Sequence, residues 1–219
     1  MDHSRIENKL PVAKEGIPFI SIGCLLTLIL ILFAFYWLSA LSAILTIFVI
    51  YFFRDPERTS EAPESAVLSP ADGKVCQIKK INKQENPLGE NALRISVFMS
   101  IFNVHVNRIP MAGKINNIEY HAGAFFSANL DKASEHNESN TITIESNTGR
   151  KIAVVQIAGL IARRIACWVK MDDVVNRGQR FGLIRFGSRL DVYLPVDFHL
   201  SVDLEQSVKS GETILGHMP

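Results

Sequence analysis

A glycine and a serine interrupt a segment whose other residues favour a β-strand. The segment is RFGSRLDVYLP, residues 185–195, and it contains Gly187 and Ser188. Glycine permits backbone conformations that other residues avoid, so a strained Gly-Ser peptide can bring the serine hydroxyl against the preceding carbonyl. Such proximity can lower the barrier to intramolecular attack by roughly 7–11 kcal/mol. An ordinary β-bulge is the commoner explanation, so the chemical hypothesis needs further residues.

A serine nucleophile needs a base within hydrogen-bonding distance and a third group that orients the base. Asp72 lies in the turn sequence SPADG, where backbone N–H groups can hold a carboxylate. His105 lies in FNVHVNRIP, and strand alternation places Asn103 and Asn107 on its side. Simpler explanations are an Asx turn for Asp72 and a half-buried histidine with a polar neighbour for His105. Together with Ser188, these residue types could carry out an intramolecular acyl shift.

The composition argues against several classes of function. The 219 residues include 23 basic and 22 acidic side chains, and this balance gives no general attraction for nucleic acid. The three cysteines, Cys24, Cys76 and Cys167, are far apart and lack the spacing of zinc ligands. We therefore expect reduced thiols, with no disulfide and no metal site.

An uncharged segment of 37 residues, 17–53, is the strongest feature of the composition. A single helix of this length would measure roughly 55 Å, against about 30 Å for the hydrocarbon core of a bilayer. We expect a transmembrane helical hairpin that turns near Trp37, Ser39 and Ser42, with one tilted pass or a monotopic insertion as alternatives. A secretory signal peptide is excluded because its apolar region would be only about 7–15 residues long. A hairpin leaves both ends on one side, and reduced cysteines favour the cytoplasmic side.

The rest of the chain indicates a linker followed by a mainly β domain. Residues 54–65 change abruptly to charged residues, proline and serine, and short β-rich runs with turn residues between them follow. Turn sequences in ADGKV (71–75) and MDDVVNRGQRFGLI (171–184) resemble those of biotinyl/lipoyl-like barrel-sandwich domains. The expected parts are an N-terminal tail (1–16), the membrane segment (17–53), the linker (54–65) and the β domain (66–219).

Six motifs, in order along the chain, resemble phosphatidylserine decarboxylase in its short, archaeal-type form, which many bacteria also carry. Each motif alone is weak evidence, but their common order makes a chance resemblance improbable. The resemblance covers about residues 52–216, and the apolar segment before it fits a membrane-bound member. The motifs are FFRDPER, SPADGKV, NVHVNRIP, YHAGAFFSA, QIAGLIARRI and RFGSRLDVYLP.

The resemblance implies a zymogen that cuts itself between Gly187 and Ser188. Ser188 would attack the Gly187 carbonyl, and elimination followed by loss of ammonia would leave a pyruvoyl cofactor at Ser188. The products would be a β chain (1–187) and an α chain (188–219). In the family the pyruvoyl carbonyl forms a Schiff base with the substrate amine, so phosphatidylserine is decarboxylated to phosphatidylethanolamine without a metal.

The resemblance also assigns roles to single residues. Ser188 matches the nucleophile, and Asp72 matches the aspartate that pairs with a histidine during self-cleavage. Longer bacterial forms have two histidines in a YHRVH motif where this chain has FNVHVN. His105 therefore serves both self-cleavage and decarboxylation, or one of the roles has moved. His121 is the reserve histidine, and Phe125 is expected in the wall of the substrate pocket.

Lipid and membrane partners follow from the same resemblance. Arg163 and Arg164 are candidates for the lipid phosphate because guanidinium groups suit phosphate oxygens, although a solvent-exposed pair is the simpler explanation. The expected partners are phosphatidylserine, the bilayer, the α and β chains themselves and a second copy in a homodimer, with no nucleic acid. The expected location is the inner membrane, with the β domain on its cytoplasmic face.

Two other functions are open. A membrane-anchored biotinyl/lipoyl-like adaptor would share the fold class without cleavage, but it would usually carry a long coiled-coil insertion that this sequence lacks. A pyruvoyl decarboxylase of a soluble amino acid would share the chemistry. A soluble substrate, however, gives no reason for an apolar segment of 37 residues.

Overall fold

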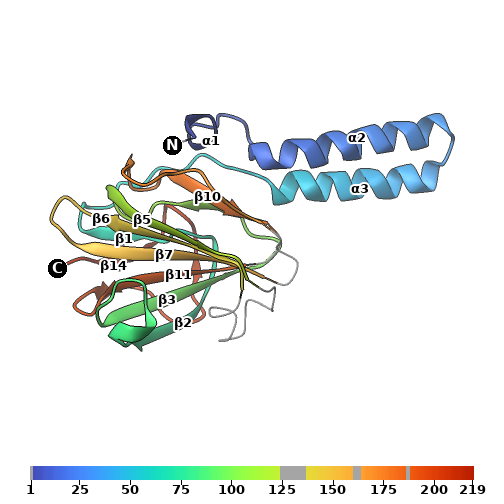
Figure 1. Ribbon diagram of the computed structural model, residues 1–219. Coiled ribbons are helices and arrows are strands. Elements are labelled where there is room, and N and C mark those ends of the chain that lie inside the picture. The colour runs from blue at the N-terminus through green and yellow to red at the C-terminus, as the bar shows by residue number, and fades with distance from the viewer. Residues whose placement is uncertain (1, 124–136, 160–163, 186–187) are drawn as a thin grey trace.

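The computed structural model describes residues 2–123, 137–159, 164–185 and 188–219. A pair of long helices projects from a domain of β-strands (Figure 1). The helices are α1 (His3–Ile6), α2 (Ile17–Leu32) and α3 (Tyr36–Phe52), with 3-10 helices η1 (Lys14–Gly16) and η2 (Lys83–Glu85). The strands are β1 (Ala66–Leu68), β2 (Gly73–Ile81), β3 (Ala92–Met99), β4 (Val106–Arg108), β5 (Gly113–His121), β6 (Ser139–Glu145), β7 (Lys151–Ala158), β8 (Ile165–Cys167), β9 (Val174–Val175), β10 (Arg180–Ile184), β11 (Ser188–Pro195), β12 (His199–Leu200), β13 (Ser207–Val208) and β14 (Ile214–His217).

The apolar segment folds into a hairpin in which α2 and α3 lie side by side (Figure 1). Residues 33–35 make the turn, where Ala34 adopts a left-handed conformation with φ 59°. The helices approach closely at Gly23, because a Cβ at that position would lie 2.4 Å from Thr46 Oγ1. Small and hydroxyl-bearing side chains therefore form the contact between the helices.

The predicted position of the turn, near Trp37, Ser39 and Ser42, was wrong, because all three residues lie within α3. The serines are compatible with a helix here because their hydroxyl groups find partners. Ser39 Oγ donates to a carbonyl oxygen of the preceding turn (2.8 Å), and Ser42 Oγ is 2.8 Å from Thr27 Oγ1 on α2. Ser42 thus holds the two helices together instead of ending one of them.

The outer surface of the hairpin is apolar. Trp37 is 92% exposed near the tip, and α2 has no buried residue. The span Lys14–Leu32 has 19 residues and is apolar enough to cross a membrane, whereas the apolar helix Tyr36–Phe52 is shorter. Such a large exposed apolar surface is suited to a nonpolar environment.

The described part of the β domain forms three antiparallel sheets. The largest has eight strands in the order β13-β2-β3-β11-β7-β6-β5-β9, and two smaller sheets have the orders β1-β14-β12 and β4-β10-β8. The long strands converge toward the side from which the hairpin projects (Figure 1). The predicted mainly β class is confirmed, and the narrower biotinyl/lipoyl-like assignment stays a prediction.

Alternation along β11 separates the two faces of the large sheet. Leu190, Val192 and Leu194 point into the main hydrophobic core. Arg189 and Asp191 lie on the opposite face, where they form a buried ion pair with 2.8 Å between Nε and Oδ1. The side chain of any β11 residue can therefore be assigned to one face from its position in the strand.

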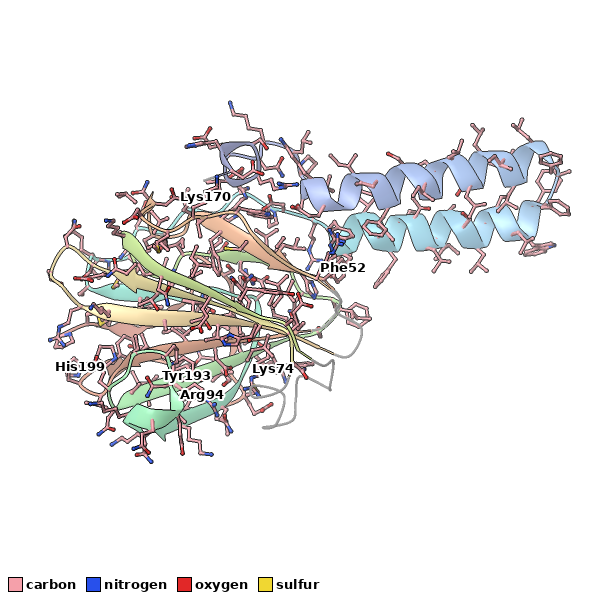
Figure 2. The ribbon with its side chains drawn as sticks, in the orientation of Figure 1. Phe52, Lys74, Arg94, Lys170, Tyr193 and His199 are labelled. Atoms are coloured by element: carbon pink, nitrogen blue, oxygen red, sulfur yellow. The ribbon has the colours of Figure 1, made fainter. Side chains whose placement is uncertain are left out.

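The end of the hairpin is part of the β-domain core. Phe52 and Phe53 are fully buried in the main core, and Figure 2 shows Phe52 at the junction between α3 and the strands. In the segment that follows, Asp55 is 2% exposed and accepts a hydrogen bond from Arg180 Nε at 2.8 Å. The hairpin is thus fixed to the β domain by buried contacts on both sides of residue 54.

Candidate active site

Ser188 begins β11 in the interior of the eight-stranded sheet. Its cross-strand neighbours are Met99 at the end of β3 and Ala158 at the end of β7. Leu190, two residues further along, points into the main core, so Ser188 faces the core as well. Gly187 lies outside the described residues. Ser188 is fully buried, and its Oγ has no hydrogen-bond partner among the residues that the structure describes. A buried hydroxyl without a partner is costly, and here it belongs to the serine that the sequence predicts to be the nucleophile.

His105 lies just before β4, on the segment that leads away from β3. The ring is fully buried and packs against Phe52 of α3, with 4.1 Å between ring centroids. Nδ1 is 2.9 Å from the carbonyl oxygen of Asn103, so Nδ1 carries the proton and donates it. The neutral ring then has its lone pair on Nε2, for which the described part of the chain supplies no partner. His105 is thus held in the tautomer that can accept a proton.

The protonation state of His105 also favours a role as a base. Burial lowers its pKa from 6.5 to about 4, and the positive charge of Arg54 acts in the same direction. The hydrogen bond to Asn103 and the negative charge of Asp72 raise the pKa, but they are outweighed. The imidazole is therefore neutral at neutral pH, as a general base must be.

A contact on β4 shows how the His105 segment lies relative to Ser188. Asn107, two residues after His105, places its Nδ2 3.7 Å from the sulfur of Met99. Met99 is in turn the cross-strand neighbour of Ser188. The His105 segment therefore crosses the core at the end of β11 that carries Ser188.

Buried amide side chains extend from this contact across the core. Gln156 Nε2 donates to Asn107 Oδ1 at 2.8 Å, and Asn140 Nδ2 donates to Gln156 Oε1 at 3.0 Å. All three residues are buried. Gln156 and Asn140 were not among the predicted site residues, although a glutamine at an inward position of the apolar strand AVVQIA was a usable signal. These hydrogen bonds fix β4 against the large sheet and so fix the position of His105.

Asp72 is buried close to the site but has partners other than His105. Both of its carboxylate oxygens accept hydrogen bonds from Arg58, with Nη2 2.9 Å from Oδ2, and Oδ1 also accepts from the backbone N–H of Ser210 at 2.8 Å. The structure therefore does not bring Asp72 into hydrogen-bond contact with His105. Asn103 O takes the orienting position, and Asp72 acts on His105 only through its charge.

Glu138 is a second carboxylate near Ser188, at the end of the sheet where β11 begins. Its backbone oxygen accepts a hydrogen bond from the N–H of Ala158, the direct neighbour of Ser188. Its side chain is buried, and Oε1 accepts from Tyr120 Oη at 3.1 Å. Next to it, Asn137 Nδ2 donates to the carbonyl oxygen of Ala158 at 2.7 Å. Nothing in the spacing of the sequence indicated that this carboxylate is buried.

The structure describes two of the four residues predicted to bind substrate. His121 is exposed and lies 3.4 Å from Glu119, and both alternate with the inward-facing positions of β5. His121 is therefore on the opposite face of the sheet from Ser188. Arg164 is described and exposed, just before β8. Phe125 and Arg163 lie outside the described residues.

The residues present fit a cofactor made from the chain itself. Within the described ranges, no group of three or more histidine, cysteine or acidic side chains is placed to hold a metal ion. Ser188 Oγ and His105 Nε2 are both buried at one end of the core without a described partner, as expected for a nucleophile and a base that react with the chain.

Comparison with known proteins identifies the family to which this chain belongs. The family model of phosphatidylserine decarboxylase matches residues 45–216. Three relatives are described as phosphatidylserine decarboxylase proenzyme. The relative from Desulfotalea psychrophila is 50% identical, with 97% of this chain and 99% of the relative covered. The relative from Syntrophus aciditrophicus is 49% identical (94% and 96% covered), and that from Ruegeria pomeroyi is 51% identical (95% and 95% covered). The chain therefore belongs to the phosphatidylserine decarboxylase family.

Proposed function

We propose that this chain is a proenzyme that cuts itself between Gly187 and Ser188 and then decarboxylates phosphatidylserine to phosphatidylethanolamine. The observation that carries the proposal is the pair of buried atoms without described partners, Ser188 Oγ and His105 Nε2, in a member of this family.

Self-cleavage follows from the protonation state of His105. Its neutral Nε2 accepts the proton of Ser188 Oγ while the oxygen attacks the carbonyl carbon of Gly187. The C–N bond between Gly187 and Ser188 then breaks and the leaving nitrogen takes up that proton, so an ester replaces the peptide bond. The hydrogen bond from Nδ1 to Asn103 O keeps the lone pair on Nε2 during this transfer. Elimination of the resulting ester leaves Gly187 with a free carboxylate, and hydrolysis at residue 188 releases ammonia and leaves the pyruvoyl group.

The pyruvoyl group supplies a carbonyl that reacts with the amine of the substrate and takes up the electrons released with carbon dioxide. The chain supplies the surroundings of that carbonyl. Met99 and Ala158 exclude water on either side of residue 188, and Glu138 places a carboxylate at the same end of these strands. Arg163 and Arg164 stay our candidates for the lipid phosphate. Phe125 stays the candidate for the pocket wall, whereas His121, on the opposite face of the sheet from Ser188, is not part of the proposal.

The hairpin anchors the enzyme in the membrane that contains its substrate. The exposed apolar surfaces of α2 and α3 support this placement. Because a hairpin returns to its side of origin, the N-terminal tail and the β domain share one side, which we take to be the cytoplasmic face of the inner membrane. A homodimer is also part of the proposal.

The test is the intact mass of the purified protein under denaturing conditions. We expect chains 1–187 and 188–219, with the smaller one lighter by one ammonia than a peptide that begins with serine. Ser188→Ala should give a single uncut chain without decarboxylase activity. Ser96→Ala is the matched control, because Ser96 is equally buried and its Oγ also has no described partner. An uncut wild-type chain would contradict the proposal and favour the adaptor function.

A further inference from the structure

A short turn at the base of the hairpin exposes two large apolar side chains. Residues 100–103 connect the end of β3 to the His105 segment, and Ile101 and Phe102 are 38% and 60% exposed. Met99, just before the turn, is the cross-strand neighbour of Ser188. The apolar tip therefore lies at the end of the β domain that contains the active site.

Hydrogen bonds hold this turn in one shape. The backbone N–H of Asn103 donates to the carbonyl oxygen of Ser100 at 3.0 Å, and Asn103 Oδ1 accepts from the backbone N–H of Ser100 at 2.9 Å. A flexible loop could turn its apolar side chains back toward the protein. This turn is closed at its base, so Phe102 stays exposed.

The turn is also attached to the last residues of α3. The carbonyl oxygen of Phe102 accepts hydrogen bonds from Tyr51 Oη at 3.1 Å and from Arg54 Nη2 at 2.7 Å. The rings of Phe102 and Phe48 pack in a T-shaped arrangement, with 6.4 Å between centroids. Ile101 and Phe102 therefore continue the apolar surface of the hairpin onto the β domain.

The length of the helices determines how close this surface comes to a bilayer. Helix α2 has 16 residues and α3 has 17. At 1.5 Å per residue these helices measure about 24–26 Å, against a hydrocarbon core of about 30 Å. A hairpin that crosses the core therefore draws its own base into the boundary between acyl chains and headgroups. A hairpin that enters only one leaflet has its base at the same boundary.

Arginine side chains lie beside both helices at this level. The guanidinium group of Arg54 is 3.9 Å from the centroid of the Tyr51 ring on α3. The guanidinium group of Arg185 lies over Phe19, in the first turn of α2, at 5.7 Å. Arg185 Nε is buried and has no partner among the described residues. Cationic groups beside an apolar surface suit the phosphates of anionic lipids.

We propose that the turn 100–103, together with Arg54 and Arg185, is a bilayer contact. Ile101 and Phe102 enter the outer part of the acyl-chain layer, and the two arginines bind anionic headgroups. The end of the sheet where β11 begins, which carries Ser188, then faces the headgroup layer. Phosphatidylserine therefore reaches the site without leaving the membrane. The inference rests on the proposed function, because it takes the hairpin to be in the membrane and the substrate to be a lipid.

The kinetic test compares two forms of the substrate in the full-length enzyme reconstituted into vesicles. One assay uses long-chain phosphatidylserine within the vesicles, and the other adds dihexanoyl phosphatidylserine as a monomer to phosphatidylcholine vesicles. For the double variant Ile101→Ser/Phe102→Ser we expect roughly tenfold lower kcat/KM on the long-chain lipid, with the short-chain rate unchanged. Val196→Ser is the matched control, because Val196 is 58% exposed and follows the far end of β11.

A depth measurement tests the same contact without turnover. In a Trp37→Phe/Trp168→Phe background, a tryptophan introduced by Phe102→Trp should be quenched by lipids brominated near the headgroup. The matched Val196→Trp variant should not be quenched. Absence of quenching at position 102, or equal loss on both substrates in the double variant, would overturn the inference. If the parent enzyme fails on the short-chain substrate as well, it is the proposed decarboxylase function that fails.

Discussion

The ring of Phe52 shields His105 from water, so a smaller side chain at position 52 should raise the pKa of that histidine. Both rings are fully buried, and their centroids are 4.1 Å apart with 36° between the planes. Burial is the main reason that the pKa of His105 falls from 6.5 to about 4. That difference corresponds to about 3 kcal/mol in favour of the neutral ring, at about 1.36 kcal/mol per unit.

Phe52→Leu is the variant of choice. Phe52→Ala would cost about 3–5 kcal/mol of stability through the cavity it leaves, whereas a leucine fills much of the space. Leucine is shorter than the ring, so water should reach one side of the imidazole, and we expect the pKa of His105 to rise by roughly one unit. Phe198→Leu is the matched control, because Phe198 is also buried and lies next to His199, at the end of the β domain away from the hairpin (Figure 2).

The assay is a histidine NMR titration of the uncut Ser188→Ala protein in micelles, with the His105 signal identified from a His105→Gln variant. In the parent protein, His105 should titrate near pH 4. The free energy of unfolding should decrease as the pH is lowered from 6.5 to about 4, because in this range the unfolded chain binds a proton that folded His105 does not bind. In Phe52→Leu the folded-state pKa of His105 is higher, so the pH range over which stability is lost should have a higher lower limit. A parent His105 that titrates near 6.5, or a Phe52→Leu variant with an unchanged pKa, would refute the reasoning.

Two further predictions concern the attachment and the packing of the hairpin. Asp55→Ala should lower the free energy of unfolding by about 3–5 kcal/mol, because it leaves the buried guanidinium of Arg180 without this carboxylate. Glu57→Ala, which removes the exposed partner of the same arginine, should lower the free energy of unfolding by less than about 1 kcal/mol. Thermal unfolding of both variants measures the difference. Gly23→Leu should separate α2 from α3, because even a Cβ there would lie 2.4 Å from Thr46 Oγ1. Fluorescence energy transfer between labels on the two helices should then decrease, and an unchanged signal would contradict the described contact.

Local patterns in the sequence predicted the features that depend on neighbouring residues. The length of the uncharged run favoured a helical hairpin over a single pass, and the β-rich segments predicted a mainly β domain. The turn of the hairpin was misplaced because serine is common in turns. In α3, Ser42 instead bonds to Thr27 across the helix pair, and sequence periodicity does not report such a partner.

The parts of the site that were missed depend on contacts between distant segments. Arg58 lies in a stretch whose charges and prolines are typical of a linker, yet its side chain binds Asp72 and is only 7% exposed. Phe52 ends an apolar helix in which nothing distinguishes a lipid-facing phenylalanine from one that packs on His105. Tertiary packing determines both contacts, and the spacing of residue types along the sequence does not predict such packing.

The placement of Ser188 determines when its chemistry can begin. Strand β11 is paired on both sides, with β3 and β7, so the reactive peptide is formed only after segments from the middle of the chain have been joined to its end. The buried hydrogen bond between Asp72 and the backbone of Ser210 adds a contact that forms only after residue 210 has been synthesised. In the proposed mechanism, a chain in which β11 is not yet paired carries an inert serine, so folding of the β domain would have to precede self-cleavage.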